Sequence, residues 1–224
     1  MNILVQSLMA AVLGLVVGLY LPMLCEKLAD YKWKKKNREL NPDDRFTGTV
    51  AKILCAAANA AGWGLCWYFG SKVAVPAVLA ALIWSLGIVL IVVDLRLRII
   101  PNEVLLGMLI IGVVMEVWVN GFESLVSCVF ASVIVFNLFA ILGKVMGLYK
   151  IGAGDVKLAM VMTMSLGYPT ILTTLLGFSV SLLLFCVGGL LLKKITLKSF
   201  LPLGPFLVPG FWVGLIVLLR NAVV

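Results

Sequence analysis

The chain has 224 residues, of which 63% are hydrophobic and only 12% are charged, and its mean hydropathy is +1.16. This composition excludes an ordinary soluble domain, and it argues against nucleic-acid binding as the reason for the net charge of +8, because cations in a membrane protein report orientation. The absence of histidine excludes serine–histidine proteases, zinc proteases with an HExxH helix and histidine proton relays.

Apolar runs long enough to cross a bilayer recur along the whole chain. A spanning helix needs roughly 17 to 25 residues, and the sequence offers about eight such runs. They cover residues 3–24, 51–69, 73–93, 103–119, 123–143, 155–168, 170–192 and 201–220. The sixth run is short, so it is either a tilted or partial span or it extends into the preceding loop. The first run lacks a signal-peptide cleavage site and is predicted to be retained. The fold class is therefore an all-α, polytopic membrane bundle.

Lysines and arginines predict the orientation of this bundle. If the N-terminus lies outside, all but two of the 18 cations fall on cytoplasmic segments, and only Lys72 and Arg220 remain outside. The excess accumulates over four loops and fits an even number of helices. Both termini are therefore expected to be extracytoplasmic.

One sizeable hydrophilic segment runs from Cys25 to Thr49 and is expected to be a cytoplasmic loop. Its lysines surround Trp33, which suits either contact with anionic headgroups or a plain positive-inside stop signal. The chain contains neither an internal repeat nor a low-complexity linker. We therefore predict a single domain over 1–224, with N-terminal helices and the basic loop in 1–72 and a core in 73–224.

Five acidic residues lie within or at the ends of predicted helices: Asp94, Glu103, Glu116, Glu123 and Asp155. A charge at the bilayer centre costs at least about 2.5 to 3.5 kcal/mol, so each is a candidate functional residue. Glu116 and Glu123 lie near outer ends, where they are expected to reach headgroups or water. Asp94 ends one helix and Asp155 begins another on the cytoplasmic side, so the topology places these two at one membrane depth.

Two carboxylates that face one cavity can perform acid–base chemistry. In peptide hydrolysis one takes a proton from water while the other donates a hydrogen bond to the scissile carbonyl, and like charges at close range separate the two titrations. Gly152 and Gly154 would let the backbone approach closely beside Asp155. Two structural alternatives stay open: Asp155 as a plain helix cap, and Asp94 as an interfacial acid neutralised by the arginines that follow it.

The stretch after Asp94 is a short basic loop that re-enters the membrane. Proline disfavours helix in the residue before it, so Ile99, Ile100 and Pro101 are expected to be extended, with Asn102 as the cap of the next helix.

Two motifs carry a family resemblance. Residues 94–102, DLRLRIIPN, and residues 152–157, GAGDVK, resemble the signatures of the bacterial type IV prepilin peptidases, which are GxGD aspartyl proteases. Residues 202–207, PLGPFL, are similar to the segment that opens this family's last helix. The resemblance covers the third to the eighth predicted helix. It implies cleavage of the basic leader from type IV prepilins or pseudopilins, after a glycine, at the cytoplasmic face of the bacterial inner membrane.

The resemblance also implies roles for single residues. Asp94 and Asp155 carry over as the catalytic pair, and Gly152 and Gly154 as backbone room. Lys157 is expected to contact headgroups or a neighbouring loop, while Pro101 and Asn102 shape the loop after Asp94. Where many members have a second aspartate, this chain has Arg96, which leaves the pair intact.

The N-terminal half departs from the family. Many members carry a four-cysteine zinc loop there and methylate the new N-terminus with S-adenosylmethionine. This loop holds one cysteine at its edge, and the five cysteines contain no CxxC pair. We expect no zinc or other metal and no cofactor for the peptidase, with S-adenosylmethionine required only if methyltransferase activity is present.

Two rival functions remain. Presenilin-like intramembrane proteases also use GxGD, but they usually have a tyrosine before the first aspartate, where Val93 stands here. An ion-coupled transporter could use Asp94 and Asp155 as a relay, although such sites usually lie near the midplane. The expected partners are prepilin substrates and membrane lipids, not nucleic acid, and the oligomeric state is open.

Overall fold

The computed structural model describes residues 2–35, 44–145, 152–192 and 203–223. In these ranges the chain is all-helical, as predicted, with eight long helices and one short helix, α2 (Asp44–Thr47). The long helices are α1 (Ile3–Lys34), α3 (Thr49–Gly70), α4 (Ala74–Leu97), α5 (Asn102–Asn120), α6 (Ser124–Val145), α7 (Ala153–Leu166), α8 (Thr170–Leu191) and α9 (Gly204–Val223).

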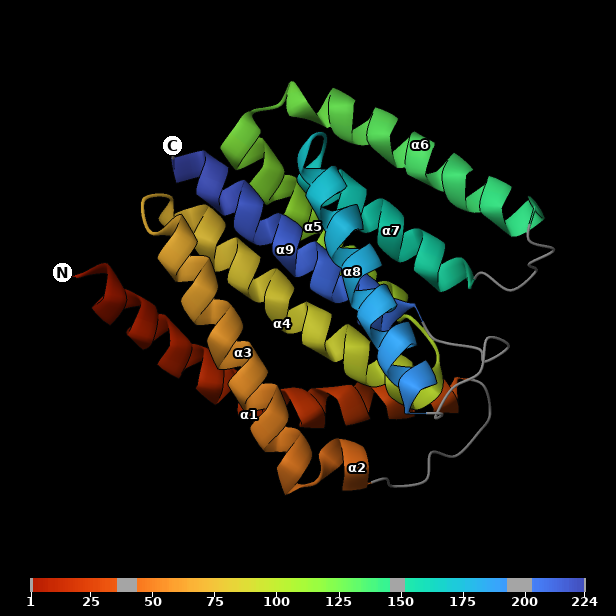
Figure 1. Cartoon of the computed structure of the whole chain (residues 1–224). Helices are drawn as coiled ribbons and strands as arrows, with labels where there is room; N and C mark the ends of the chain where they lie inside the picture. Colours follow the sequence, from red (N-terminus) through yellow and green to blue (C-terminus); the bar gives the residue numbers. More distant parts are fainter. Residues whose placement is uncertain (1, 36–43, 146–151, 193–202, 224) are drawn as a thin grey trace.

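Seven of the long helices are long and apolar enough to cross a membrane, and α7 is the exception among those described. Its 14 residues span about 21 Å at ~1.5 Å per residue, against a hydrocarbon core of ~30 Å. The short sixth run was thus read correctly from the sequence. In Figure 1 the two termini lie at the same end of the bundle, which is expected if α7 is counted together with the seven candidate spans. Which end faces the cytoplasm stays a prediction.

Helices α4 and α9 form the centre of the bundle. α9 packs on α3, α4, α7 and α8, and α4 has the largest buried share of the seven candidate spans. Helix α6 lies at one edge, on α5 and α7, and α1 lies towards the opposite edge, on α3 and α4 (Figure 1). Trp84 of α4 stacks on Trp212 of α9 with ring centroids 4.2 Å apart, which fixes the rotation of α9 against α4.

The N-terminal helices are attached by small residues. A Cβ on Gly18 of α1 would lie 2.6 Å from Ala56 Cα of α3, so the two backbones touch as in other small-xxx-small pairs. Next to this contact, Asn59 donates to Gly14 O at 2.8 Å and accepts at 2.8 Å from Ser85 of α4. The buried amide is thus satisfied while it joins three helices.

Helix α1 is longer than the first predicted span. It contains Pro22, which removes a backbone hydrogen bond, and Figure 1 shows its two parts running in different directions. The expectation that Cys25–Thr49 is a loop is therefore wrong for residues 25–34, which are helical, and for α2. The reason is a buried stripe of Leu21, Cys25 and Ala29 that continues at helical spacing past the last fully apolar turn.

Candidate active site

Asp94 lies in the last turn of α4 and is 4% exposed. The helix ends at Arg98, whose φ of 53° and ψ of 42° are left-handed, and the Arg98 N–H donates to Asp94 O at 2.7 Å. A left-handed residue is a common helix terminator. It reverses the chain towards α5 while the Asp94 side chain stays inside the bundle.

The Asp94 carboxyl rests against the start of α9. A Cβ on Gly204 would lie 2.5 Å from Asp94 Oδ2, so only a glycine leaves room for the carboxyl here. Oδ2 is buried and has no hydrogen-bond partner among the described residues. Buried polar atoms are nearly always paired, so this oxygen is available to a water molecule or a substrate. Gly204 belongs to the PLGPFL stretch, but sequence patterning gave no sign that it contacts Asp94.

Asp155 lies in the first turn of α7, three residues after the N-cap Gly152. The Asp155 N–H donates to Gly152 O at 2.9 Å, and the Asp155 carboxyl lies near the Gly152 backbone. The N-cap of α7 is therefore Gly152, and the alternative that Asp155 stabilises the helix start stays open, because a negative charge in the first turn is favourable there. A carboxyl in this position can also take part in acid–base catalysis.

The two glycines before Asp155 make different contacts. A Cβ on Gly152 would lie 2.9 Å from Asp155 Oδ2, so this glycine leaves room for the carboxyl. A Cβ on Gly154 would lie 3.0 Å from Ile100 Cβ, so that glycine lets α7 approach the loop between α4 and α5. Both positions therefore provide backbone room next to Asp155.

One cavity of about 260 Å³ brings the two motifs together. Its lining comes from the end of α4, the loop after it, the start of α5 and the start of α7: Asp94, Arg98, Ile99, Ile100, Asn102, Gly152, Ala153, Gly154, Asp155 and Lys157. The two carboxyls are close enough to interact electrostatically. The arrangement can therefore hold one water molecule or one peptide carbonyl between two acids.

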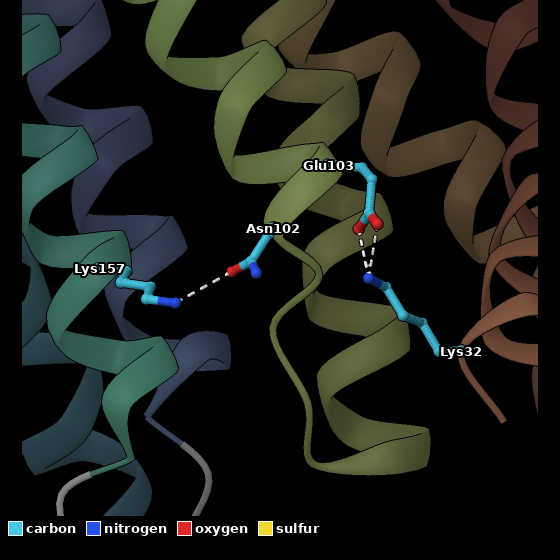
Figure 2. A network of polar contacts seen from close by, with 4 residues as sticks. All are labelled: Lys32, Asn102, Glu103 and Lys157. Atoms are coloured by element: carbon cyan, nitrogen blue, oxygen red, sulfur yellow. Dashed lines mark hydrogen bonds and ion pairs between the residues drawn. The ribbon is translucent and has the colours of Figure 1, made fainter. Parts of the chain in front are cut away.

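Asn102 and Lys157 contact each other at the mouth of this cavity. The Lys157 Nζ donates to Asn102 Oδ1 at 3.3 Å, as Figure 2 shows. Asn102 is therefore not the predicted cap: Pro101 is the N-cap of α5, with φ −70° and ψ 127°, and Asn102 is its first helical residue. Because the extended proline takes the N-cap position, the Asn102 amide is free to bind α7. Lys157 thus contacts the neighbouring segment, one of its two predicted roles.

The arginines after Asp94 do not neutralise it through a salt bridge. Asp94 forms no ion pair with any residue in the described ranges. The exposed Arg98 is close enough for a weaker electrostatic attraction, while the guanidinium of Arg96 lies over the Phe46 ring at 5.9 Å. The alternative that Asp94 is only an interfacial acid explains the nearby charge of Arg98. It does not explain why the Asp94 side chain is buried.

Glu116 differs from expectation. It is 2% exposed, and its Oε1 accepts hydrogen bonds from Asn120 at 2.9 Å and Cys128 at 3.8 Å. The prediction that it reaches headgroups or water is wrong, because α6 and the turn at Gly167 cover it. It lies 14 residues along α5 from Asn102, about 21 Å at ~1.5 Å per residue, and so is remote from the cavity. Glu123 is exposed, as expected.

No group of three or more cysteine, aspartate or glutamate side chains in the described ranges could hold a metal ion. The residues that line the cavity include the two aspartates and polar side chains next to them.

Comparison with known proteins gives one result at the level of family. Residues 79–188 match the type IV leader peptidase family, and this segment contains Asp94, Asp155 and the whole lining of the cavity. It is just under half of the chain. No curated protein and no solved structure matches. The chain's several apolar helices indicate a multi-pass membrane protein, and the match of residues 79–188 to the type IV leader peptidase family supports a peptidase.

Proposed function

We propose that the protein is an aspartyl endopeptidase of the bacterial cytoplasmic membrane that removes the basic leader from type IV prepilins or pseudopilins. The observation that carries this proposal is the shared cavity of Asp94 and Asp155, which come from separate helices. The cavity lies at the end of the bundle where α4 ends in arginines and α7 begins beside Lys157. The positive-inside pattern assigns that end to the cytoplasm.

The chemistry follows from two carboxyls that share one proton. The ionised carboxyl takes a proton from water, and the resulting hydroxide equivalent attacks the scissile carbonyl carbon. The protonated carboxyl donates a hydrogen bond to the carbonyl oxygen and stabilises the tetrahedral intermediate. The C–N bond then breaks as a proton passes to the leaving amine, without a covalent enzyme intermediate. The Oδ2 atom of Asp94, which is buried and has no hydrogen-bond partner among the described residues, supports this role.

The substrate would bind with its leader at the cytoplasmic mouth and its apolar helix against the bundle, so that the bond after a leader glycine reaches the aspartates. Hydrolysis of this kind needs no cofactor. Methylation of the product would require S-adenosylmethionine and remains a separate question.

The test is cleavage of a panel of leader-bearing prepilins by the purified protein in lipid vesicles, with new N-termini identified by mass spectrometry. We expect a single cut after a glycine, and the product mass reports methylation in the same spectrum. Asp94→Asn and Asp155→Asn should each lower the rate by at least about 10²- to 10⁴-fold, the usual contribution of acid–base catalysis. Wild-type rates in either folded variant would refute the mechanism.

The same measurement separates the rival functions. Cuts inside the substrate's membrane span would favour a presenilin-like protease. Ion transport in vesicles that depends on both aspartates, without cleavage of any leader, would favour a transporter.

A further inference from the structure

The N-terminal region lies outside the segment that matches the peptidase family, yet it reaches the catalytic end of the bundle. Lys32, in the last turn of α1, places its Nζ 2.7 Å from Oε1 and 2.5 Å from Oε2 of Glu103 (Figure 2). The Lys32 side chain is only 15% exposed, whereas that of Glu103 is 50% exposed. The lysine is thus sheltered and bound to both carboxylate oxygens.

Glu103 is the neighbour of Asn102 in the first turn of α5. This turn is therefore held from two sides, by Lys32 of α1 and by Lys157 of α7 (Figure 2). Neither lysine belongs to α5 or to the helix that carries Asp94. The two contacts fix the first turn of α5 relative to both neighbouring helices.

The position of this turn determines one wall of the catalytic cavity. Only residues 99–101 and the left-handed Arg98 separate α4 from α5, and both Ile99 and Ile100 line the cavity. Ile100 also packs on Gly154, next to Asp155. With so short a connection, a shift of the first turn of α5 moves the wall between the two aspartates.

We propose that Lys32 is a positioning residue for the peptidase: through its ion pair with Glu103 it holds the first turn of α5 and hence the loop between Asp94 and Asp155. This inference rests on the proposed function. Because the Glu103 carboxylate is half-exposed, the pair is expected to contribute little to global stability, whereas small displacements at a catalytic site lower the rate steeply. Loss of the pair should therefore affect turnover more than stability.

The experiment compares Lys32→Met, Glu103→Gln and the exchanged pair Lys32→Glu/Glu103→Lys with the wild type. Lys34→Met is the matched control, because Lys34 lies in the same helical turn but pairs with Asp30 on its own helix, at 2.8 Å. We expect kcat to fall about tenfold in both single variants, with KM changed less than about twofold and the melting temperature retained. The exchanged pair should recover most of the lost kcat, and Lys34→Met should behave as the wild type.

Hydrogen exchange of the backbone amides in residues 98–104 provides a readout that does not depend on the substrate. These amides should exchange faster in Lys32→Met than in Lys34→Met. If the wild type cleaves no leader, the proposed function fails, and this exchange difference still decides whether Lys32 holds the loop. Equal exchange in the two variants would overturn the inference. So would an unchanged kcat in Lys32→Met, or a loss that the exchanged pair does not recover.

Discussion

The two ends of the bundle each bury a carboxylic acid, and they do so in opposite ways. Glu116 at one end is covered by α6 and accepts hydrogen bonds from Asn120 and Cys128. Asp94 at the other end lines a cavity and interacts with a second acid, and each of the two buried acids keeps one carboxylate oxygen without a partner in the described ranges. Burial alone therefore does not distinguish a structural carboxyl from a candidate catalytic one. The surroundings do: donors and close packing for Glu116, space and another acid for Asp94.

The largest expected effect tests this distinction directly. Asp94→Asn should lower the cleavage rate by about 10²- to 10⁴-fold, because an amide cannot take up or release the shared proton. Glu116→Gln should keep the wild-type kcat in the same prepilin assay. The wild-type rate should also show a bell-shaped dependence on pH, since one acid must be ionised and the other protonated. A comparable loss of kcat in Asp94→Asn and Glu116→Gln would mean that the two buried acids do not have different roles.

The next effect concerns the room beside Asp94. Gly204→Ala would place a methyl group 2.5 Å from the present Oδ2 position and should displace the carboxyl. We expect kcat to fall about 10²-fold, as misplaced catalytic groups usually cause. Gly188→Ala is the control, because nothing lies within 4 Å of a Cβ there. Full activity in Gly204→Ala would mean that Asp94 can act from another position.

A stability effect is expected at the other end. Glu116→Ala leaves the buried Cys128 thiol without its acceptor, whereas the exposed Asn120 amide can bond to water, so we expect a loss of about 1 kcal/mol of unfolding free energy. Denaturation in detergent should show this loss, while cleavage per folded molecule is retained. The exposed Glu123→Ala serves as the control. If Glu116→Ala were stable but inactive, this end would have a catalytic role too.

The smallest effect should come from the contact at the mouth of the cavity. Asn102→Ala removes the 3.3 Å contact with Lys157, and exposed pairs of this kind contribute at most about 1 kcal/mol, so we expect a rate loss of about fivefold or less. Lys157→Met should cause the same loss, and the double variant should add little. A much larger loss in Lys157→Met alone would indicate that the ammonium itself contacts substrate.

The sequence predicted most of the fold because apolar runs report membrane helices directly. It also placed Asp94 and Asp155 on the same side of the membrane. The number of helices between the two residues and the distribution of lysines and arginines decide on which side each helix end lies. The catalytic role of the two aspartates stays a prediction. What it missed depends on tertiary packing: the α1 extension follows a sparse buried stripe, and the burial of Glu116 requires α6 and the turn at Gly167. Likewise, Asn102 looked like a cap because nothing local shows that Pro101 takes that position.

The length of α7 has a consequence for the surrounding bilayer. At about 21 Å the helix leaves ~9 Å of a ~30 Å hydrocarbon core unspanned, and such hydrophobic mismatch is relieved by local thinning of the lipid or by wetting of the helix end. Asp155 lies in the first turn of this helix. We therefore expect water to penetrate further into the bilayer near the two aspartates than elsewhere around the protein. A peptide bond just outside a substrate's anchoring helix could then be hydrolysed while that helix stays in the membrane.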